Sequence, residues 1–258
     1  MKLAVTGKGG VGKTTFTVLL AHALQKGEGA VTVIDADPNT NLAAAIGCPN
    51  AGDIKPLIEL KDMIEERTGV KPGSTGGMFR LNPFVEDIPS KYAVKVDGIN
   101  VLVAGGLKKG GSGCYCPENA LVRALVSHLL LERNGTLILD MEAGIEHLSR
   151  ATVASVDFLL IVVEPGSRSA ETARRINVLA GELGIPRVAA VGNKIRHAGQ
   201  QGQMARALPE LVFAGFIPFD EAIYEAETMG KPVLKAGKEV KEAIQEVVDF
   251  LKNTGKKR

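Results

Sequence analysis

The sequence has no tryptophan, and aromatic residues make up only 4% of its 258 residues. It has three cysteines, which are too few for the disulfide framework of a secreted scaffold, so the cytoplasm is the expected compartment. No run of about 18 apolar residues occurs, and we expect no membrane-spanning helix. Residues 1–7 are typical of a strand that runs into glycines, not of a signal peptide.

The chain also has no large excess of positive or negative charge. The 31 Lys and Arg residues against 29 Asp and Glu residues give a net charge of +2, which does not suggest a nucleic-acid partner. Hydrophobic residues make up 45% of the chain and charged residues 23%, which excludes a disordered or collagen-like protein. No internal repeat or unusual linker is present, so we expect one domain over residues 1–258.

Short runs rich in Val, Ile and Leu alternate with helical patterns along the chain. Most of these runs are apolar throughout, as strands covered on both faces must be. The alternation predicts an α/β fold with a doubly wound, mostly parallel sheet and helices on both faces. The expected strands are residues 3–6, 31–35, 100–104, 136–140, 158–163, 187–192 and 214–217. The expected helices are residues 13–26, 54–67, 117–133, 170–183, 203–208 and 238–253, and residues 70–89 are expected to form a surface excursion.

Residues 7–14 fit the phosphate-loop pattern of Gly, four residues and Gly-Lys-Thr, between an expected strand and helix. Backbone N–H groups of such a loop converge on an anion, and the helix N-terminus adds its positive end. Lys13 is expected to reach the outer phosphates and Thr14 to offer its hydroxyl to Mg²⁺. The glycines also spell a dinucleotide fingerprint, with Asp35 as the ribose-binding acid, but that fingerprint needs neither Lys13 nor Thr14. The expected phosphate cradle is Gly7, Gly9, Gly10, Val11, Gly12, Lys13 and Thr14.

Charged residues near the ends of the strands are the next candidates. Lys8 is not needed for the cradle: it is either a solvated loop lysine or a charge that reaches the nucleotide of a facing subunit. Asp37 follows the second strand and could orient a water toward a γ-phosphate. Asp140 ends another apolar strand, with Gly144 four residues later, which suits a carboxylate beside Mg²⁺ and a glycine that senses the γ-phosphate. Asn193 could bind an adenine edge, although an Asn-Lys pair after a strand is more often a turn.

Taken together, these motifs resemble those of the MinD/ParA/NifH-like ATPases. Residues 7–15 match the deviant Walker A motif of that class, residues 35–38 its switch I and residues 140–144 its switch II. The resemblance covers nearly the whole chain and also includes Asn193, residues 217–220 and residues 230–233. It implies an ATPase that converts ATP and water to ADP and phosphate with Mg²⁺ and forms a homodimer around two ATP molecules.

The same resemblance assigns roles to individual residues. It implies that Lys8 crosses the dimer to the partner's phosphates and that Asp37 orients the attacking water. It also implies that Thr15 and Pro218 belong to the nucleotide site.

Cys114 and Cys116 follow a glycine-rich arm at residues 105–113. In an extended segment both thiols point to one side, which makes a two-thiolate chelate for a soft ion such as Ni²⁺ or Zn²⁺. A closed site wants four ligands, so the same pair from a second subunit is the natural completion. Two unremarkable thiols or an incidental disulfide are the alternatives. His128 and Cys48 are expected to be packed residues and not ligands.

A Cys-x-Cys pair within this motif set resembles the CooC family, the nickel-insertion ATPases of carbon monoxide dehydrogenase maturation, whose relatives serve acetyl-CoA synthase. The resemblance implies a metallochaperone whose client is one of these two enzymes. An ATP-gated reductase with an iron–sulfur cluster and a MinD/ParA-type positioning protein remain open. The amphipathic residues 239–258 leave membrane contact possible, but they suit packing on the sheet better.

Overall fold

One sheet of eight strands organises the part of the chain that the structure describes. The structure is a computed structural model, and it describes residues 1–27, 29–72, 78–106, 116–132, 135–143, 145, 155–233 and 235–255. The strand order is β3-β4-β2-β5-β1-β6-β7-β8, and every neighbouring pair is parallel except β3 with β4. The strands are β1 (Lys2–Thr6), β2 (Val31–Ala36), β3 (Val94–Val96), β4 (Ile99–Val103), β5 (Thr136–Met141), β6 (Phe158–Val163), β7 (Val188–Ile195) and β8 (Val212–Pro218).

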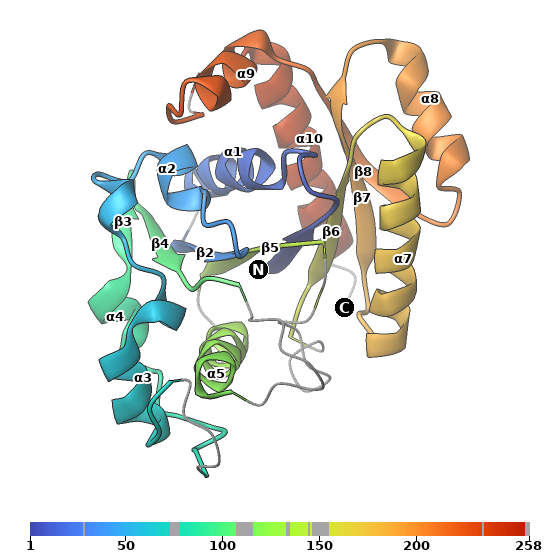
Figure 1. Cartoon of the computed structure of the whole chain (residues 1–258). Helices are drawn as coiled ribbons and strands as arrows, with labels where there is room; N and C mark the ends of the chain where they lie inside the picture. Colours follow the sequence, from blue (N-terminus) through green and yellow to red (C-terminus); the bar gives the residue numbers. More distant parts are fainter. Residues whose placement is uncertain are drawn as a thin grey trace.

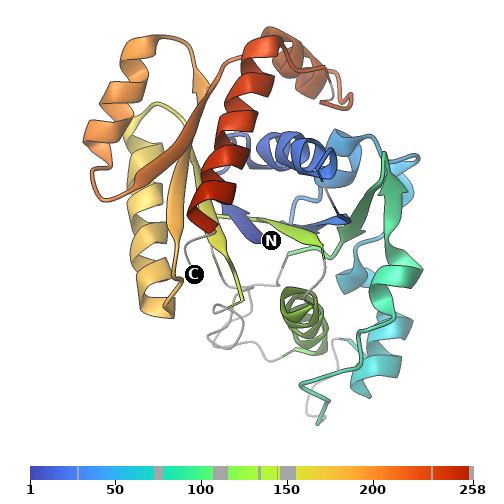
Figure 2. The ribbon, with the colours of Figure 1, turned by 180° about the vertical axis from the view of Figure 1, so that it is seen from behind.

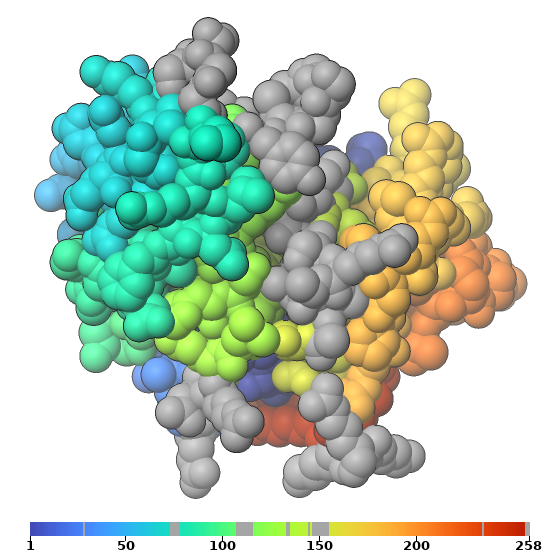
Figure 3. Space-filling model, turned by 90° about the horizontal axis from the view of Figure 1, so that it is seen from below, coloured from blue at the N-terminus to red at the C-terminus, as the bar shows by residue number. Residues whose placement is uncertain are grey.

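Helices cover both faces of this sheet, which confirms the predicted α/β architecture (Figures 1 and 2). One face carries α1 (Lys13–Gln25), α2 (Leu42–Ile46), α9 (Glu221–Thr228) and α10 (Lys238–Gly255). The other face carries α3 (Lys61–Thr68), α4 (Ile88–Tyr92), α5 (Pro117–Leu131), α7 (Ser167–Leu183) and α8 (Ala198–Ala207). Seen from below, α3 and α5 are neighbours on this second face, and α7 lies farther along it (Figure 3).

The two helical layers explain why the central strands are apolar throughout. Every residue of β1 and of β6 is buried, because each strand packs against a helical layer on both sides. Two large apolar cores result, one on each face of the sheet. Uninterrupted Val, Ile and Leu runs are the sequence pattern that such doubly covered parallel strands require.

The helix α10 uses its apolar side within the molecule. Val240, Ile244, Val247 and Leu251 recur at helical spacing and are all buried. A Cβ on Gly215 of β8 would lie 2.8 Å from Val247, so the helix packs closely on the sheet. This is the packing that we expected for the C-terminal segment. Within the described residues, no helix is long and apolar enough to cross a bilayer.

Two expected helices have the wrong bounds. The helix predicted at residues 54–67 is broken into a 3₁₀ turn, η2 (Leu57–Glu59), and the shorter α3. Pro56, which is extended at ψ 141° and has no N–H to donate, keeps residues 54–56 out of a helix, and Leu60, with ψ 76°, separates η2 from α3. The helix predicted at residues 203–208 begins five residues earlier, as α8, because His197 and Gln200 form a capping box there. A further 3₁₀ turn, η1, spans Ala51–Asp53.

Four short elements were not predicted at all: α2, α4, α9 and β3. The β3–β4 hairpin turns at Asp97 and Gly98, which have φ angles of 47° and 84°. An Asp-Gly pair in this conformation is a strong hairpin signal that sequence reasoning missed. The start of α9 carried a signal too, because the Asp220 side chain caps it by accepting from the Ile223 N–H. The element α4 begins inside the predicted excursion at residues 70–89.

Candidate nucleotide site

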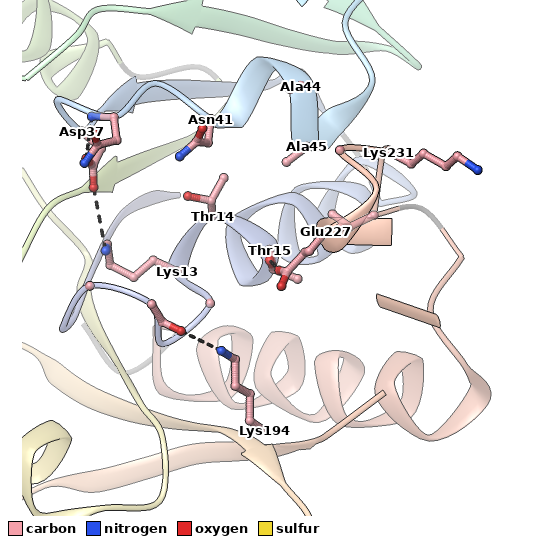
Figure 4. A pocket seen from close by; sticks show the side chains of 16 residues that line it. Lys13, Thr14, Thr15, Asp37, Asn41, Ala44, Ala45, Lys194, Glu227 and Lys231 are labelled. Carbon is pink, nitrogen blue, oxygen red and sulfur yellow. Dashed lines mark hydrogen bonds and ion pairs between the residues drawn. The ribbon is translucent and has the colours of Figure 1, made fainter. Parts of the chain in front are cut away.

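The loop between β1 and α1 opens onto a cavity of about 460 Å³ at the carboxyl end of the sheet (Figure 4). β1 lies between β5 and β6. The strands β2 to β5 lie on one side of β1, and β6 to β8 lie on the other. This is the point where the strand order reverses, and open α/β sheets bind their ligands at such a point. The cavity is lined by Gly9, Gly10 and residues 12–15 of the loop and helix start, by Asp37, Asn39 and Asn41 after β2, and by Glu227, Gly230, Lys231 and Val233, whereas the predicted cradle residue Val11 is buried in the core.

Two glycines are needed for the shape of the loop. Gly12 has a left-handed backbone with φ 88°, and a Cβ there would lie 2.5 Å from the amide nitrogen of Asn193. Gly7 has φ 150°, and a Cβ there would lie 2.4 Å from the carbonyl oxygen of Val162. Any side chain at either position would therefore push the loop away from β6 or β7.

The end of β7 supports the loop through two side chains. The Asn193 side chain donates a 2.8 Å hydrogen bond to the Val11 carbonyl, and Lys194 Nζ donates one of 2.6 Å to the Gly10 carbonyl. Lys194 itself has a left-handed backbone with φ 58°. The amide of Asn193 thus supports the loop backbone, and its expected contact with adenine stays a prediction.

The predicted catalytic residues Lys13 and Asp37 meet at the mouth of the loop. Lys13 Nζ lies 3.8 Å from Asp37 Oδ2, and both side chains are mostly buried. Figure 4 shows the two side chains pointing toward each other from α1 and from the segment after β2. Asp37 Oδ1 also accepts a hydrogen bond of 2.9 Å from the Asn39 N–H, which fixes the carboxylate above the loop.

Two further carboxyl groups lie directly under the loop. Asp35 and Asp140 are partners in register on the neighbouring strands β2 and β5, and their exposed fractions are 1% and 0%. Asp35 accepts hydrogen bonds from the N–H groups of Asp37 and Leu42, at 3.2 Å and 2.9 Å. The two carboxyl groups therefore lie side by side near the carboxyl ends of β2 and β5, two residues before Asp37 in the case of Asp35.

Burial controls the ionisation of this pair. Burial raises the pKa of Asp35 to about 7, and the nearby charge of Asp140 raises it further. The hydrogen bonds from the backbone N–H groups of Leu42 and Asp37 act in the opposite direction and lower the pKa. Burial also raises the pKa of Asp140 to about 7, although the nearby Thr14 hydroxyl and the charge of Lys13 favour the ionised form. Thr14 and Asp140 thus bring two hard oxygen donors together beside Lys13, which is the chemistry that Mg²⁺ prefers.

A second cavity of about 360 Å³ adjoins the first and shares Gly12, Thr15, Lys194 and Glu227 with it. Its walls include Pro218, one of the predicted site residues, whose role stays a prediction, and several residues that sequence reasoning missed. The guanidinium of Arg196 lies 3.6 Å from the ring centroid of Phe219, and the Phe219 and Tyr224 rings are 5.9 Å apart. Flat groups of this kind suit the face of a purine.

Glu227 lies at the junction of the two cavities. The Thr15 hydroxyl donates a hydrogen bond to its carboxylate, so the loop contacts α9 directly. Tyr224 and Glu227 are three residues apart on α9 and line the same cavity. Because this helix was not predicted, the sequence analysis could not place Tyr224 and Glu227 on one helix face. Their spacing of three residues was the signal that could have indicated it.

Lys8 lies outside the phosphate cavity. Its Nζ is 3.9 Å from Glu164 Oε1, and its side chain is 37% exposed. Lys8 is not among the described residues that line either cavity. Its predicted role toward a second subunit stays a prediction.

The candidate metal ligands are only partly placed. Cys114 and Gly144 lie outside the described residues, and Cys116 is half-buried at the N-cap of α5 with an extended backbone. Cys48 is buried, as expected for a small apolar residue, and His128 Nε2 lies 3.2 Å from a carboxylate oxygen of Glu132, the C-cap residue of α5. Within the described ranges, no group of three His, Cys, Asp or Glu residues could hold a metal ion.

Known proteins share both the sequence and the fold. Residues 2–233 match the model of the CobQ/CobB/MinD/ParA nucleotide binding domain. The chain is 42% identical to an uncharacterized ATP-binding protein of Methanocaldococcus jannaschii over 259 residues, which covers 98% of this chain and all of that relative. It is 46% identical to the carbon monoxide dehydrogenase accessory protein CooC of Rhodospirillum rubrum over 232 residues, which covers 89% of this chain and 88% of the relative. The structure of the cell division protein MinD of Aquifex aeolicus has the same fold, with a TM-score of 0.68, 23% identity and 98% of both chains covered. The chain therefore belongs to the CobQ/CobB/MinD/ParA family of nucleotide-binding proteins.

Proposed function

We propose that this chain is a single-domain, cytoplasmic ATPase that dimerises with ATP and delivers nickel to apo carbon monoxide dehydrogenase or acetyl-CoA synthase. The observation that carries the ATPase half is the placement of Lys13, Thr14, Asp37 and Asp140 around one phosphate loop. The relative that carries the nickel half is the carbon monoxide dehydrogenase accessory protein, at 46% identity over most of both chains.

The two cavities suggest how ATP lies in the site. The loop cavity takes the phosphates, because its N–H groups and Lys13 supply the positive charge. The second cavity takes the base against Arg196 and Phe219, and the ribose then falls near Thr15 and Glu227, which both cavities share. Thr14 and Asp140 would hold Mg²⁺, which neutralises charge on the outer phosphates.

Asp37 and Lys13 divide the work of hydrolysis. Lys13 neutralises the phosphates, so its ammonium is drawn away from Asp37 when ATP is bound. The carboxylate of Asp37 is then left to accept a hydrogen bond from a water and to orient its oxygen toward the γ-phosphate. The hydrogen bond from the Asn39 N–H keeps Asp37 in place for this step.

The metal cargo is held by Cys114 and Cys116 of both subunits. Each chain supplies two thiolates, and a second chain on a two-fold axis completes a closed set of four for Ni²⁺, or for Zn²⁺ in its place. Because both subunits contribute ligands, metal binding and dimerisation strengthen each other by the same factor. ATP therefore changes metal affinity without touching the cysteines.

The test is a titration of Ni²⁺ into reduced protein with and without a non-hydrolysable ATP analogue, followed by native mass spectrometry and absorbance. One ion per dimer is expected, and it is lost in the Cys114→Ser/Cys116→Ser double variant. Cys48→Ala is the matched control, because this buried thiol is not a ligand in the proposal. One ion per monomer, or a site that survives the double change, overturns the shared thiolate site. Acid-labile sulfide with a visible absorption band would instead establish an iron–sulfur protein.

A further inference from the structure

Glu164 lies between two lysines at the end of β6. Its Oε1 is 3.9 Å from Lys8 Nζ, and its Oε2 is 4.0 Å from Lys194 Nζ. The lysine side chains are each 37% exposed and the glutamate is 29% exposed, so water reaches all three. One carboxylate thus neutralises part of the charge of two ammonium groups beside the phosphate loop, where Glu164 and Lys194 line the second cavity.

Of these three groups, only Lys8 has no second anchor among the contacts described for its ammonium. Lys194 is fixed by its 2.6 Å hydrogen bond to the Gly10 carbonyl, seen in Figure 4. The backbone of Glu164 is fixed as well, because its N–H donates to the buried Ser169 hydroxyl at the start of α7. Lys8 is therefore the member that can leave while the other two keep their places.

We propose that Glu164 is a positioning residue that keeps Lys8 on its own subunit until two ATP-bound chains meet. This inference rests on the proposed function, in which Lys8 acts on the nucleotide of the partner. Lys8 must give up Glu164 before it can reach phosphates across the interface, so the ion pair opposes dimerisation. The phosphates bound to the second chain carry more negative charge than one carboxylate. When ATP is bound, they therefore replace Glu164 as the partner of the Lys8 ammonium.

Partly exposed ion pairs are weak, which suits a contact that has to be exchanged. Such a pair shifts an equilibrium by about threefold, and a symmetric dimer breaks two of them. Removing Glu164 should therefore lower the dimer dissociation constant by roughly tenfold. Without nucleotide the variant should stay monomeric, because the uncovered lysines repel their counterparts in the second chain.

The experiment measures the dimer dissociation constant by sedimentation, with a non-hydrolysable ATP analogue bound, for wild type, Glu164→Gln and Glu164→Asp. Glu164→Gln should dimerise at about tenfold lower concentration, and Glu164→Asp should behave nearly as wild type. Added KCl should narrow the difference between wild type and Glu164→Gln, because salt screens the pair, whereas a packing effect would be insensitive to salt. Glu182→Gln is the matched control: it removes an exposed carboxylate of α7 for which no ion pair is described.

A double-mutant cycle isolates Lys8. In a Lys8→Ala background, which should not dimerise with ATP, Glu164→Gln should not restore the dimer, because Glu164 acts only through Lys8. A dimer restored by Glu164→Gln in that background, or no shift in wild type, overturns the inference while leaving the ATP-dependent dimer intact. If wild type binds nucleotide but never dimerises, the dimer of the proposed function fails first, and the role of Glu164 fails with it.

Discussion

Lys13 Nζ and Asp37 Oδ2 lie 3.8 Å apart, so the predicted phosphate-binding lysine and the predicted water-orienting carboxylate neutralise each other at the mouth of the loop. Both side chains are mostly buried, and each therefore keeps its partner until a stronger one arrives. In the proposed function the γ-phosphate is that partner for Lys13. The carboxylate of Asp37 becomes available only when ATP is bound, which ties the reactive geometry to the presence of the substrate.

Lys13→Ala tests the phosphate loop. It removes the one loop ammonium that points toward the phosphate cavity and leaves Asp37 buried without its partner. We expect ATP hydrolysis to fall by at least about a hundredfold. The measurement is phosphate release at saturating ATP, with thermal unfolding to show that the variant is folded. Unchanged turnover in a folded variant would refute the assignment of the loop.

Lys8→Ala and Asp37→Asn should fail in different ways. Lys8→Ala should bind ADP like wild type, because Lys8 lies outside the phosphate cavity, but it should not dimerise with ATP. Asp37→Asn should bind ATP and dimerise, yet hydrolyse it at least about a hundredfold more slowly. Nucleotide binding by fluorescence and mass by light scattering distinguish the two. A Lys8→Ala protein that dimerises normally with ATP would count against its role across the interface.

Gly12→Ala should destabilise the protein and weaken nucleotide binding. The substitution forces an alanine into φ 88° and places its Cβ 2.5 Å from the Asn193 amide. We expect a loss of about 1–3 kcal/mol in the free energy of unfolding. Gly9→Ala is the control in the same loop, because nothing lies within 4 Å of a Cβ there. Equal unfolding midpoints for the two variants in urea would contradict the account of the loop.

The stability of the nucleotide-free protein should fall as pH rises from about 4 to about 7. In this window the folded state keeps protons on Asp35 and Asp140, whose pKa values burial raises to about 7, while the unfolded chain has lost them. The unfolded state then binds fewer protons, and the free energy of unfolding decreases with pH. The loss should be on the order of a few kcal/mol.

Asp140→Asn checks this dependence, because an amide stays neutral at every pH in the window. Urea denaturation at pH 5, 6, 7 and 8 should show a flatter profile for the variant than for wild type, with the dependence that the buried Asp35 supplies still present. Mg²⁺ needs the ionised carboxylate, so its contribution to nucleotide affinity should grow as pH rises through 7 in wild type. Parallel stability profiles for the two proteins would rule out the buried pair as the source.

Patterns of neighbouring residues predicted much of this molecule. They could not predict the features that depend on contacts between segments distant in the sequence. The loop at residues 7–14 needs only the glycines and the alternation of strand and helix around it, so its place at the sheet edge could be predicted. The pairing of Asp35 with Asp140 could not, because it depends on β5 inserting between β2 and β1. The sequence shows that both residues end strands, but not that the strands are neighbours.

The second cavity depends on contacts between distant segments in the same way. Arg196 stacks on Phe219 because β7 and β8 are adjacent, and Glu227 reaches Thr15 because α9 packs beside α1. The absence of helix at residues 54–56 is different, because Pro56 itself predicts it. Applying the known effect of proline on helices would have shortened the helix predicted at residues 54–67. The expectation for Cys114 lies outside the described residues and stays a prediction.

The hydrogen bonds from β7 to the loop also set the order in which the protein can mature on the ribosome. The loop is made first, but its supports Asn193 and Lys194 come 182 and 184 residues after the carbonyls that they hold. β1 likewise waits for β5 and β6 before it has neighbours on either side. A nascent chain that stops short of residue 194 therefore carries the whole phosphate-loop motif without the two side chains that hold the loop in place.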